Sequence, residues 1–284
     1  MRILFWRAQT ARFSIRSGGR AIGQTFTNFV VLGGFRLSQS LASTRFLFYH
    51  KSMTLKERFK TPQNTDELKE TYKQNQLVYY TPKEELINVV THAFGTIFAL
   101  IFMVFMLIKA TTPAAYASAV LSCVLIAIEF AVSATYHGVS NLKRKLIWRK
   151  VDFPAVNLNV IACAVATCLM YGTVYGYVAL GVSLAIALVI FILCQARFDI
   201  FRKVSVASTF VIGGLMFAAF FTAYFSQKGI SQATSFVYLA GLASCLLGAA
   251  VFGVHKRYVH CLFHVFVLVG PILFLVATYM QIIA

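Results

Sequence analysis

Seven long apolar segments follow one another between residues 87 and 282 and constrain the fold more than any other feature of the sequence. They are 87–108, 114–136, 152–171, 173–194, 204–225, 231–252 and 259–282. Each is near the roughly 20 residues that a helix needs to cross the hydrocarbon core of a bilayer. Only 12% of the residues are charged, against about 25% in soluble domains, which excludes an ordinary soluble enzyme. We predict an all-α polytopic membrane protein whose seven transmembrane helices form one domain at 84–284.

The basic residues between the segments are unevenly distributed, and this predicts the topology. Connections after the second, fourth and sixth segments hold ten of them, whereas the other connections hold two. The ten are Lys143, Arg144, Lys145, Arg149, Lys150, Arg197, Arg202, Lys203, Lys256 and Arg257, and the two are Lys109 and Lys228. Because Lys and Arg are retained on the inner side of a membrane, we expect the N-terminus inside and the C-terminus outside. The net charge of +17 therefore reflects topology, and no nucleic-acid-binding motif accompanies it.

Residues 1–53 form a basic N-terminal extension. Up to residue 56 the chain holds nine basic residues and no acidic one, with frequent Ser and Thr. This composition is typical of an organelle transit peptide and would indicate a mitochondrial membrane. The alternatives are a solvated basic tail, or a true start at Met53 and location in the plasma membrane. Residues 54–83 are a polar segment before the membrane, and Thr81-Pro82 marks the start of the first long helix.

Four polar residues are expected at one depth, near the inner side of the bundle. His137 ends the second segment, Asp152 opens the third, and His260 and His264 open the seventh. Polar groups inside a membrane are costly and therefore mark candidate functional sites. His260 and His264 share a helix face because they are four residues apart. Three histidines plus one open position are typical of a catalytic zinc site.

The predicted chemistry follows from these residue types. Zinc lowers the pKa of a bound water to about 7 and so supplies a nucleophile at neutral pH. Asp152 is the candidate general base, and Ser133, one turn before His137, can hydrogen-bond water or a substrate carbonyl. The alternative is that these histidines only pack or bond between helices.

Two further polar residues are candidates for a supporting role around the metal. His92 lies near the inner end of the first segment, and Glu129 shares a helix face with Ser133 and His137. His92 can contact a metal ligand or serve as a reserve ligand, and Glu129 can support the site or line a polar headgroup pocket. A purely structural hydrogen bond inside the bundle is the alternative for both.

The sequence resembles the progestin and adipoQ receptor family, whose bacterial relatives are called hemolysin III. The likeness covers roughly residues 82–282 and includes the N-inside topology. It lies in Ser133-x-x-x-His137, Asp152 after a basic stretch, His260-x-x-x-His264 and Glu85-x-x-Asn88-x-x-x-His92. The resemblance implies a zinc ion held by His137, His260 and His264, with Asp152 contacting the metal-bound water. It also implies kinship with alkaline ceramidases, and hence hydrolysis of a lipid amide with release of a fatty acid.

The chain departs from the family in one stretch. Residues 162–170 are rich in Ala, Cys and Thr and lack the Gly/Ser/Thr-Pro pattern, which bears on the shape of the cavity rather than on the metal. No hormone-binding surface is identifiable, so adiponectin-type signalling is not carried over.

Three functions are compatible with this reading. The first is a zinc-dependent lipid amidohydrolase. The second is a non-catalytic receptor or lipid-homeostasis protein with a structural zinc. A pore-forming hemolysin ranks last, because the segments lack the rows of charge that a conducting path needs. Each has a membrane lipid as its expected partner and none has nucleic acid, while the oligomeric state is left open.

Overall fold

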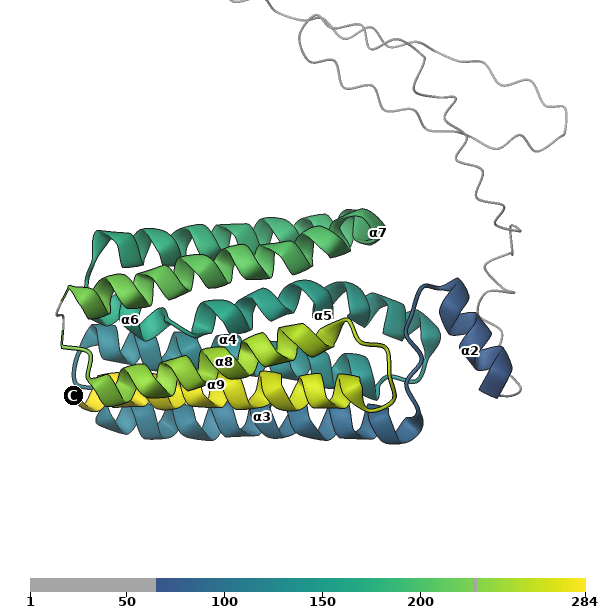
Figure 1. The fold of residues 1–284 in the computed structure, drawn as a ribbon, viewed down its shortest axis with the longest axis horizontal. Coiled ribbons are helices and arrows are strands. Elements are labelled where there is room, and N and C mark those ends of the chain that lie inside the picture. The colour runs from purple at the N-terminus through teal and green to yellow at the C-terminus, as the bar shows by residue number, and fades with distance from the viewer. Residues whose placement is uncertain (1–64, 227–228) are drawn as a thin grey trace, which may run out of the picture. The chain divides into compact units, whose positions relative to one another are not determined.

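The computed structural model describes residues 65–226 and 229–284, and these residues are helical apart from short connections (Figure 1). The helices are α2 (Thr65–Gln74), α3 (Pro82–Lys109), α4 (Pro113–Gly138), α5 (Leu142–Ala162), α6 (Val165–Met170), α7 (Val174–Phe225), α8 (Gln232–Phe252) and α9 (Val259–Ile283). The predicted extension 1–53, with its transit-peptide, start-site and localisation alternatives, lies outside the described residues. So does the first part of the polar segment 54–83.

Five of the described helices, α3, α4, α7, α8 and α9, are long and apolar enough to cross a membrane. An unbroken helix of the length of α7 would extend about 78 Å, far more than the roughly 30 Å hydrocarbon core. Its backbone leaves helical geometry at Arg197 (φ −144°, ψ 69°). Figure 1 shows α7 doubling back there, and both predicted segments 173–194 and 204–225 fall within it.

The third predicted segment, 152–171, corresponds to two shorter helices. α5 ends at Ala162, and the chain passes through a non-helical Ala164 (φ −130°) before α6 begins. This break lies where the sequence departs from the family pattern, and it forms there without a proline. Gly172 then adopts a positive φ of 59°, which only glycine adopts without strain, and so allows the short link into α7.

Local sequence explains where α3 begins. Thr81 caps it and forms a reciprocal capping box with Glu84, and Pro82 occupies the first turn. The expectation of a helix start at Thr81-Pro82 is therefore confirmed. One face of α3 carries exposed apolar side chains, including Phe94, Ile101 and Phe105, which suits contact with lipid.

The basic run 143–150 was expected to connect two segments, but it is helical. Asn141 caps α5 through its side chain, which accepts a hydrogen bond from the Arg144 amide. Lys145 is only 1% exposed, and Arg149 is also buried. The run thus forms the first two turns of α5, and part of its charge points into the protein.

Helix packing brings together the helix ends that carry the site residues. α3 packs against both α4 and α9, while α8 packs against α9 and α7 packs against α5 and α6. α4 ends at the end of the bundle where α3 and α9 begin, which we call the cluster end (Figure 1). The cluster end therefore gathers the last turn of α4 and the first turns of α3, α5 and α9.

Candidate metal centre

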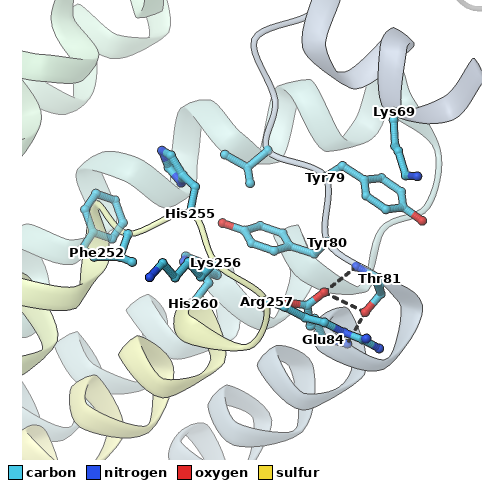
Figure 2. Close-up of a pocket in the computed structure, with 12 residues that line it drawn as sticks. Lys69, Tyr79, Tyr80, Thr81, Glu84, Phe252, His255, Lys256, Arg257 and His260 are labelled. Atoms are coloured by element: carbon cyan, nitrogen blue, oxygen red, sulfur yellow. Dashed lines mark hydrogen bonds between the residues drawn. The ribbon is translucent and has the colours of Figure 1, made fainter. Parts of the chain in front are cut away.

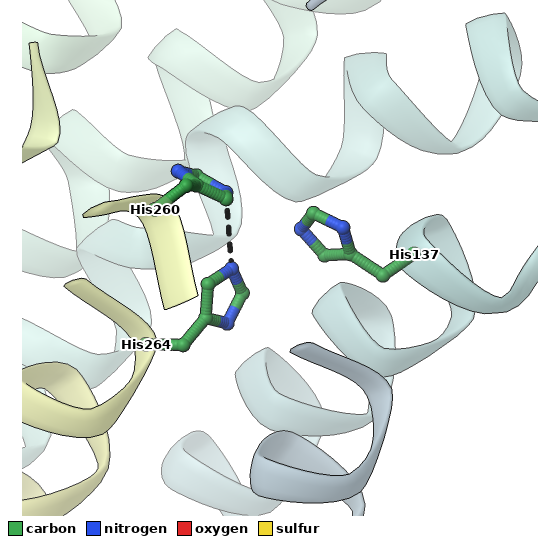
Figure 3. A group of neighbouring side chains, drawn as sticks. All are labelled: His137, His260 and His264. Carbon is green, nitrogen blue, oxygen red and sulfur yellow. Dashed lines mark hydrogen bonds between the residues drawn. The ribbon is translucent and has the colours of Figure 1, made fainter. Parts of the chain in front are cut away.

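Three histidines meet at the cluster end (Figure 3). His137 lies in the last turn of α4, and His260 and His264 occupy the first two turns of α9. The start of α9 is held to α3, because the backbone N–H of Tyr258 donates to Glu84 Oε1 at 2.7 Å. This bond fixes the level at which both α9 histidines enter the bundle.

The spacing of the three imidazoles fits a single metal ion. One ring nitrogen from each lies within 4.8 Å of the others. His260 Nε2 and His264 Nε2 are 3.1 Å apart. Three nitrogens around a tetrahedral zinc at 2.0–2.1 Å lie about 3.4 Å from one another. His137 and His264 are buried and His260 is half-buried, so the cluster can hold a metal away from bulk water.

His137 is oriented from behind by α3. Its Nδ1 lies 2.6 Å from Glu85 Oε2 and 3.3 Å from Asn88 Nδ2. A ligating histidine commonly donates its other N–H to a carboxylate, which fixes the tautomer. With Nδ1 engaged by Glu85, Nε2 is the nitrogen of His137 that is free to bind a metal.

His264 is supported in the same way. Its Nδ1 lies 2.8 Å from His92 Nε2, which leaves Nε2 beside His260. His92 is almost fully buried, and its Nδ1 has no hydrogen-bond partner in the described structure. The structure therefore places His92 against a predicted ligand, as expected of a supporting residue.

Asp152 and Ser133 lie beside the cluster. The Asp152 carboxylate is close enough to Ser133, His137 and Lys145 to interact electrostatically with them. Ser133 is buried and Asp152 half-buried. Neither belongs to the group of metal-spaced side chains.

The structure does not bring Glu129 to the histidines. Its Oε2 accepts a hydrogen bond from Asn159 Nδ2 at 3.2 Å. Glu129 shares a face of α4 with His137 but lies eight residues earlier, which is about 12 Å along the helix axis. A buried interhelical bond, the structural alternative in the sequence analysis, describes Glu129 better than a supporting role at the metal.

Tyr80 is part of the site, although periodicity and spacing gave no indication of it. Its ring stacks on His260 with 4.5 Å between centroids and 16° between planes. Burial raises the pKa of Tyr80 well above its ordinary value, and Glu85 and Glu84 raise it further, so the phenol is neutral. The only local signal was its place just before the Thr81-Pro82 helix start.

A pocket of about 280 Å³ opens beside the cluster (Figure 2). His260 lines it together with the aromatic residues Tyr79, Tyr80 and Phe252 and the basic residues Lys256 and Arg257. The pocket thus gives a ligand from outside the bundle a route to one of the three histidines.

Comparison with known proteins agrees with this arrangement. No solved structure matches the chain. The family described as haemolysin-III related matches residues 80–275, from the residue before the α3 cap to within the last turns of α9. The match includes all three clustered histidines, Asp152 and the supporting residues of α3. The chain therefore belongs to the haemolysin-III related family and is an integral multi-pass membrane protein, as the sequence resemblance predicted.

Proposed function

We propose that the histidine cluster holds one zinc ion and that the protein hydrolyses a lipid amide of the ceramide type, releasing a fatty acid. The carrying observation is the buried set of three imidazoles, two of which are oriented from behind by Glu85 and His92. A purely structural cluster does not require a carboxylate beside it, yet Asp152 lies there in contact with Ser133.

Each residue then has a defined task. His137, His260 and His264 hold the ion. Zinc in a three-histidine site supplies a Lewis acid and lowers the pKa of water to about 7. The Asp152 carboxylate would accept the proton that water loses and return it to the departing amine nitrogen. The Ser133 hydroxyl, which is close to that carboxylate, would orient it.

The pocket supports a lipid substrate. Its aromatic lining suits the apolar part of an amphiphile, and its basic residues suit a polar headgroup. Tyr80 and Phe263 both stack on the His260 ring, so aromatic surface surrounds the ligand that the pocket reaches.

We also propose seven spans with the N-terminus inside. α7 would contribute two spans on either side of Arg197, and α5 with α6 would contribute one. Gln195 Nε2 donates to the Lys150 carbonyl at 2.8 Å, so the turn in α7 lies beside the start of α5. The basic residues near Lys150, Arg197 and Lys256 then share one side. Reporter tags in the 110–112 and 253–257 connections should report opposite sides of the membrane, and reports from the same side would refute this topology.

The deciding experiment measures zinc content and fatty-acid release on the same purified protein. We expect about one zinc per chain and turnover of at least one lipid amide from a panel of ceramides. His137→Ala and His264→Ala should lose both. His255→Ala is the matched control for zinc content, because His255 is exposed and lies outside the cluster.

The outcomes separate the candidate functions. A well-folded wild-type protein without zinc, after purification in zinc-containing buffer, would refute the metal site. Stoichiometric zinc without turnover of any lipid amide would refute the enzyme and favour a receptor with a structural metal.

A further inference from the structure

We propose that Glu85 is the positioning residue of the metal centre and that the same carboxylate joins three helices by pairing with the buried Lys145. This inference rests on the proposed metal site. It assigns to one ion pair two separable tasks, which are the orientation of His137 and the joining of three helices.

The two oxygens of Glu85 are divided between two partners. Oε2 lies 2.6 Å from His137 Nδ1, and Oε1 lies 2.7 Å from Lys145 Nζ. The His137 side chain is 2% exposed and that of Lys145 1%, against 18% for Glu85. The carboxylate therefore reaches inward to two groups that water does not solvate.

Lys145 is satisfied by the end of the helix that carries His137. Besides Glu85, its ammonium group lies 3.2 Å from the Tyr136 carbonyl, 3.5 Å from that of His137 and 3.4 Å from that of Val139. These carbonyls lie at the C-terminus of α4, where the helix dipole favours a cation. A buried ammonium needs a compensating anion, and Glu85 is the carboxylate that pairs with it.

This arrangement fixes the tautomer of His137. A carboxylate held at Nδ1 keeps a proton on that nitrogen and leaves the lone pair of Nε2 for the metal. Lys145 is on α5 and Glu85 on α3, so the ion pair also links both helices to the end of α4. Removing the carboxylate should weaken metal binding, whereas removing the ammonium should weaken the fold alone.

Paired variants separate these tasks. Glu85→Gln alone leaves Lys145 buried without its counter-charge and can prevent folding. We therefore compare Lys145→Met with the double variant Glu85→Gln/Lys145→Met, which removes both charges. Arg144→Met is the matched control, because Arg144 is the preceding residue on α5 and is exposed.

The readouts are the zinc dissociation constant, from competition with a chromophoric chelator, and the melting temperature of the zinc-free protein. In the double variant we expect zinc to bind about 10- to 100-fold more weakly, the range found when a ligand's supporting partner is lost. Lys145→Met should melt lower than wild type without zinc, yet bind zinc no more weakly. The control should match wild type in both readouts.

Wild-type zinc affinity in the folded double variant would overturn the role of Glu85. If the double variant does not fold, Lys145→Met alone tests the proposal. A loss of zinc affinity that accompanies its loss of stability would mean that the ion pair only stabilises the fold. A wild-type protein that binds no zinc would instead refute the proposed function, so the two failures are distinguishable.

Discussion

Gly95→Ala is a small change that should disturb both the packing and the metal centre. Gly95 lies on α3, one turn after His92. Side chains of α4 and α9 pack closely against α3 at this position. A Cβ there would lie 2.4 Å from Phe130 Cδ2, 2.6 Å from Phe130 Cε2 and 2.8 Å from Leu268 Cδ1. Ordinary carbon contacts are about 3.5–4.0 Å, so the Phe130 ring must move by about 1 Å.

The expected cost can be worked from two opposing terms. Overpacking a buried site typically costs about 1–3 kcal/mol, and replacing glycine within a helix returns about 0.5–1 kcal/mol. The difference lies between about 0 and 2.5 kcal/mol, and the three contacts below 3.0 Å favour its upper part, a net loss of about 1–2 kcal/mol. Phe130 is fully buried, and its ring centroid lies 4.8 Å from that of His92. A displaced ring presses on His92, whose bond to His264 is 2.8 Å, so zinc affinity should fall as well.

The assay is thermal unfolding of detergent-purified protein, with and without zinc. A loss of 1–2 kcal/mol should lower the melting temperature by roughly 2–8 °C. Gly181→Ala in α7 is the control, because no atom lies within 4 Å of its added Cβ and the change should be neutral or slightly stabilising. If Gly95→Ala melts and binds zinc like the control, the close approach of α3 to Phe130 does not limit the fold.

Three further predictions concern the surroundings of the cluster. Asp152→Asn should retain full zinc, measured per chain, but lose fatty-acid release; unchanged turnover would exclude Asp152 as the proton acceptor. Tyr80→Ala removes the ring stacked on His260 and should speed zinc removal by a chelator, and an unchanged rate would show that Tyr80 does not cover the metal. Burial, aided by Glu85 and Tyr79, raises the pKa of Tyr72 from 10.0 to about 12. The unfolded chain therefore ionises first, and the stability due to this phenol is lost as pH rises from 10 to 12. Denaturant titrations should show that the free energy of unfolding falls less between pH 10 and 12 in Tyr72→Phe than in the wild type.

The helices could be predicted from sequence where local signals define them. Thr81-Pro82 located the start of α3, and the apolar segments located the bodies of the long helices. The basic run around Lys145 was misinterpreted as a connection. Glu85, 60 residues earlier in the chain, allows the ammonium group of Lys145 to be buried there. No spacing pattern in the sequence indicates this contact.

The depth at which the site residues lie in the bundle could be predicted from the sequence, but their contacts could not. Charge alternation placed His137 beside the α9 histidines, because it fixed which helix ends share a side. Helix periodicity placed Glu129 on the face of His137, yet a shared face does not imply a shared depth. The contact of Tyr80 with His260 depends on how the segment before α3 folds back, which no periodic pattern encodes.

The placement of two ligands on α9 has a consequence for biosynthesis. A nascent chain that stops before residue 259 already holds His137 and Glu85 but neither His260 nor His264. A single imidazole cannot close a zinc site of three protein ligands. If the cluster binds zinc as proposed, the metal can be captured only after α9 has been made and has docked between α3 and α8, so zinc loading would distinguish finished, correctly inserted molecules from truncated ones.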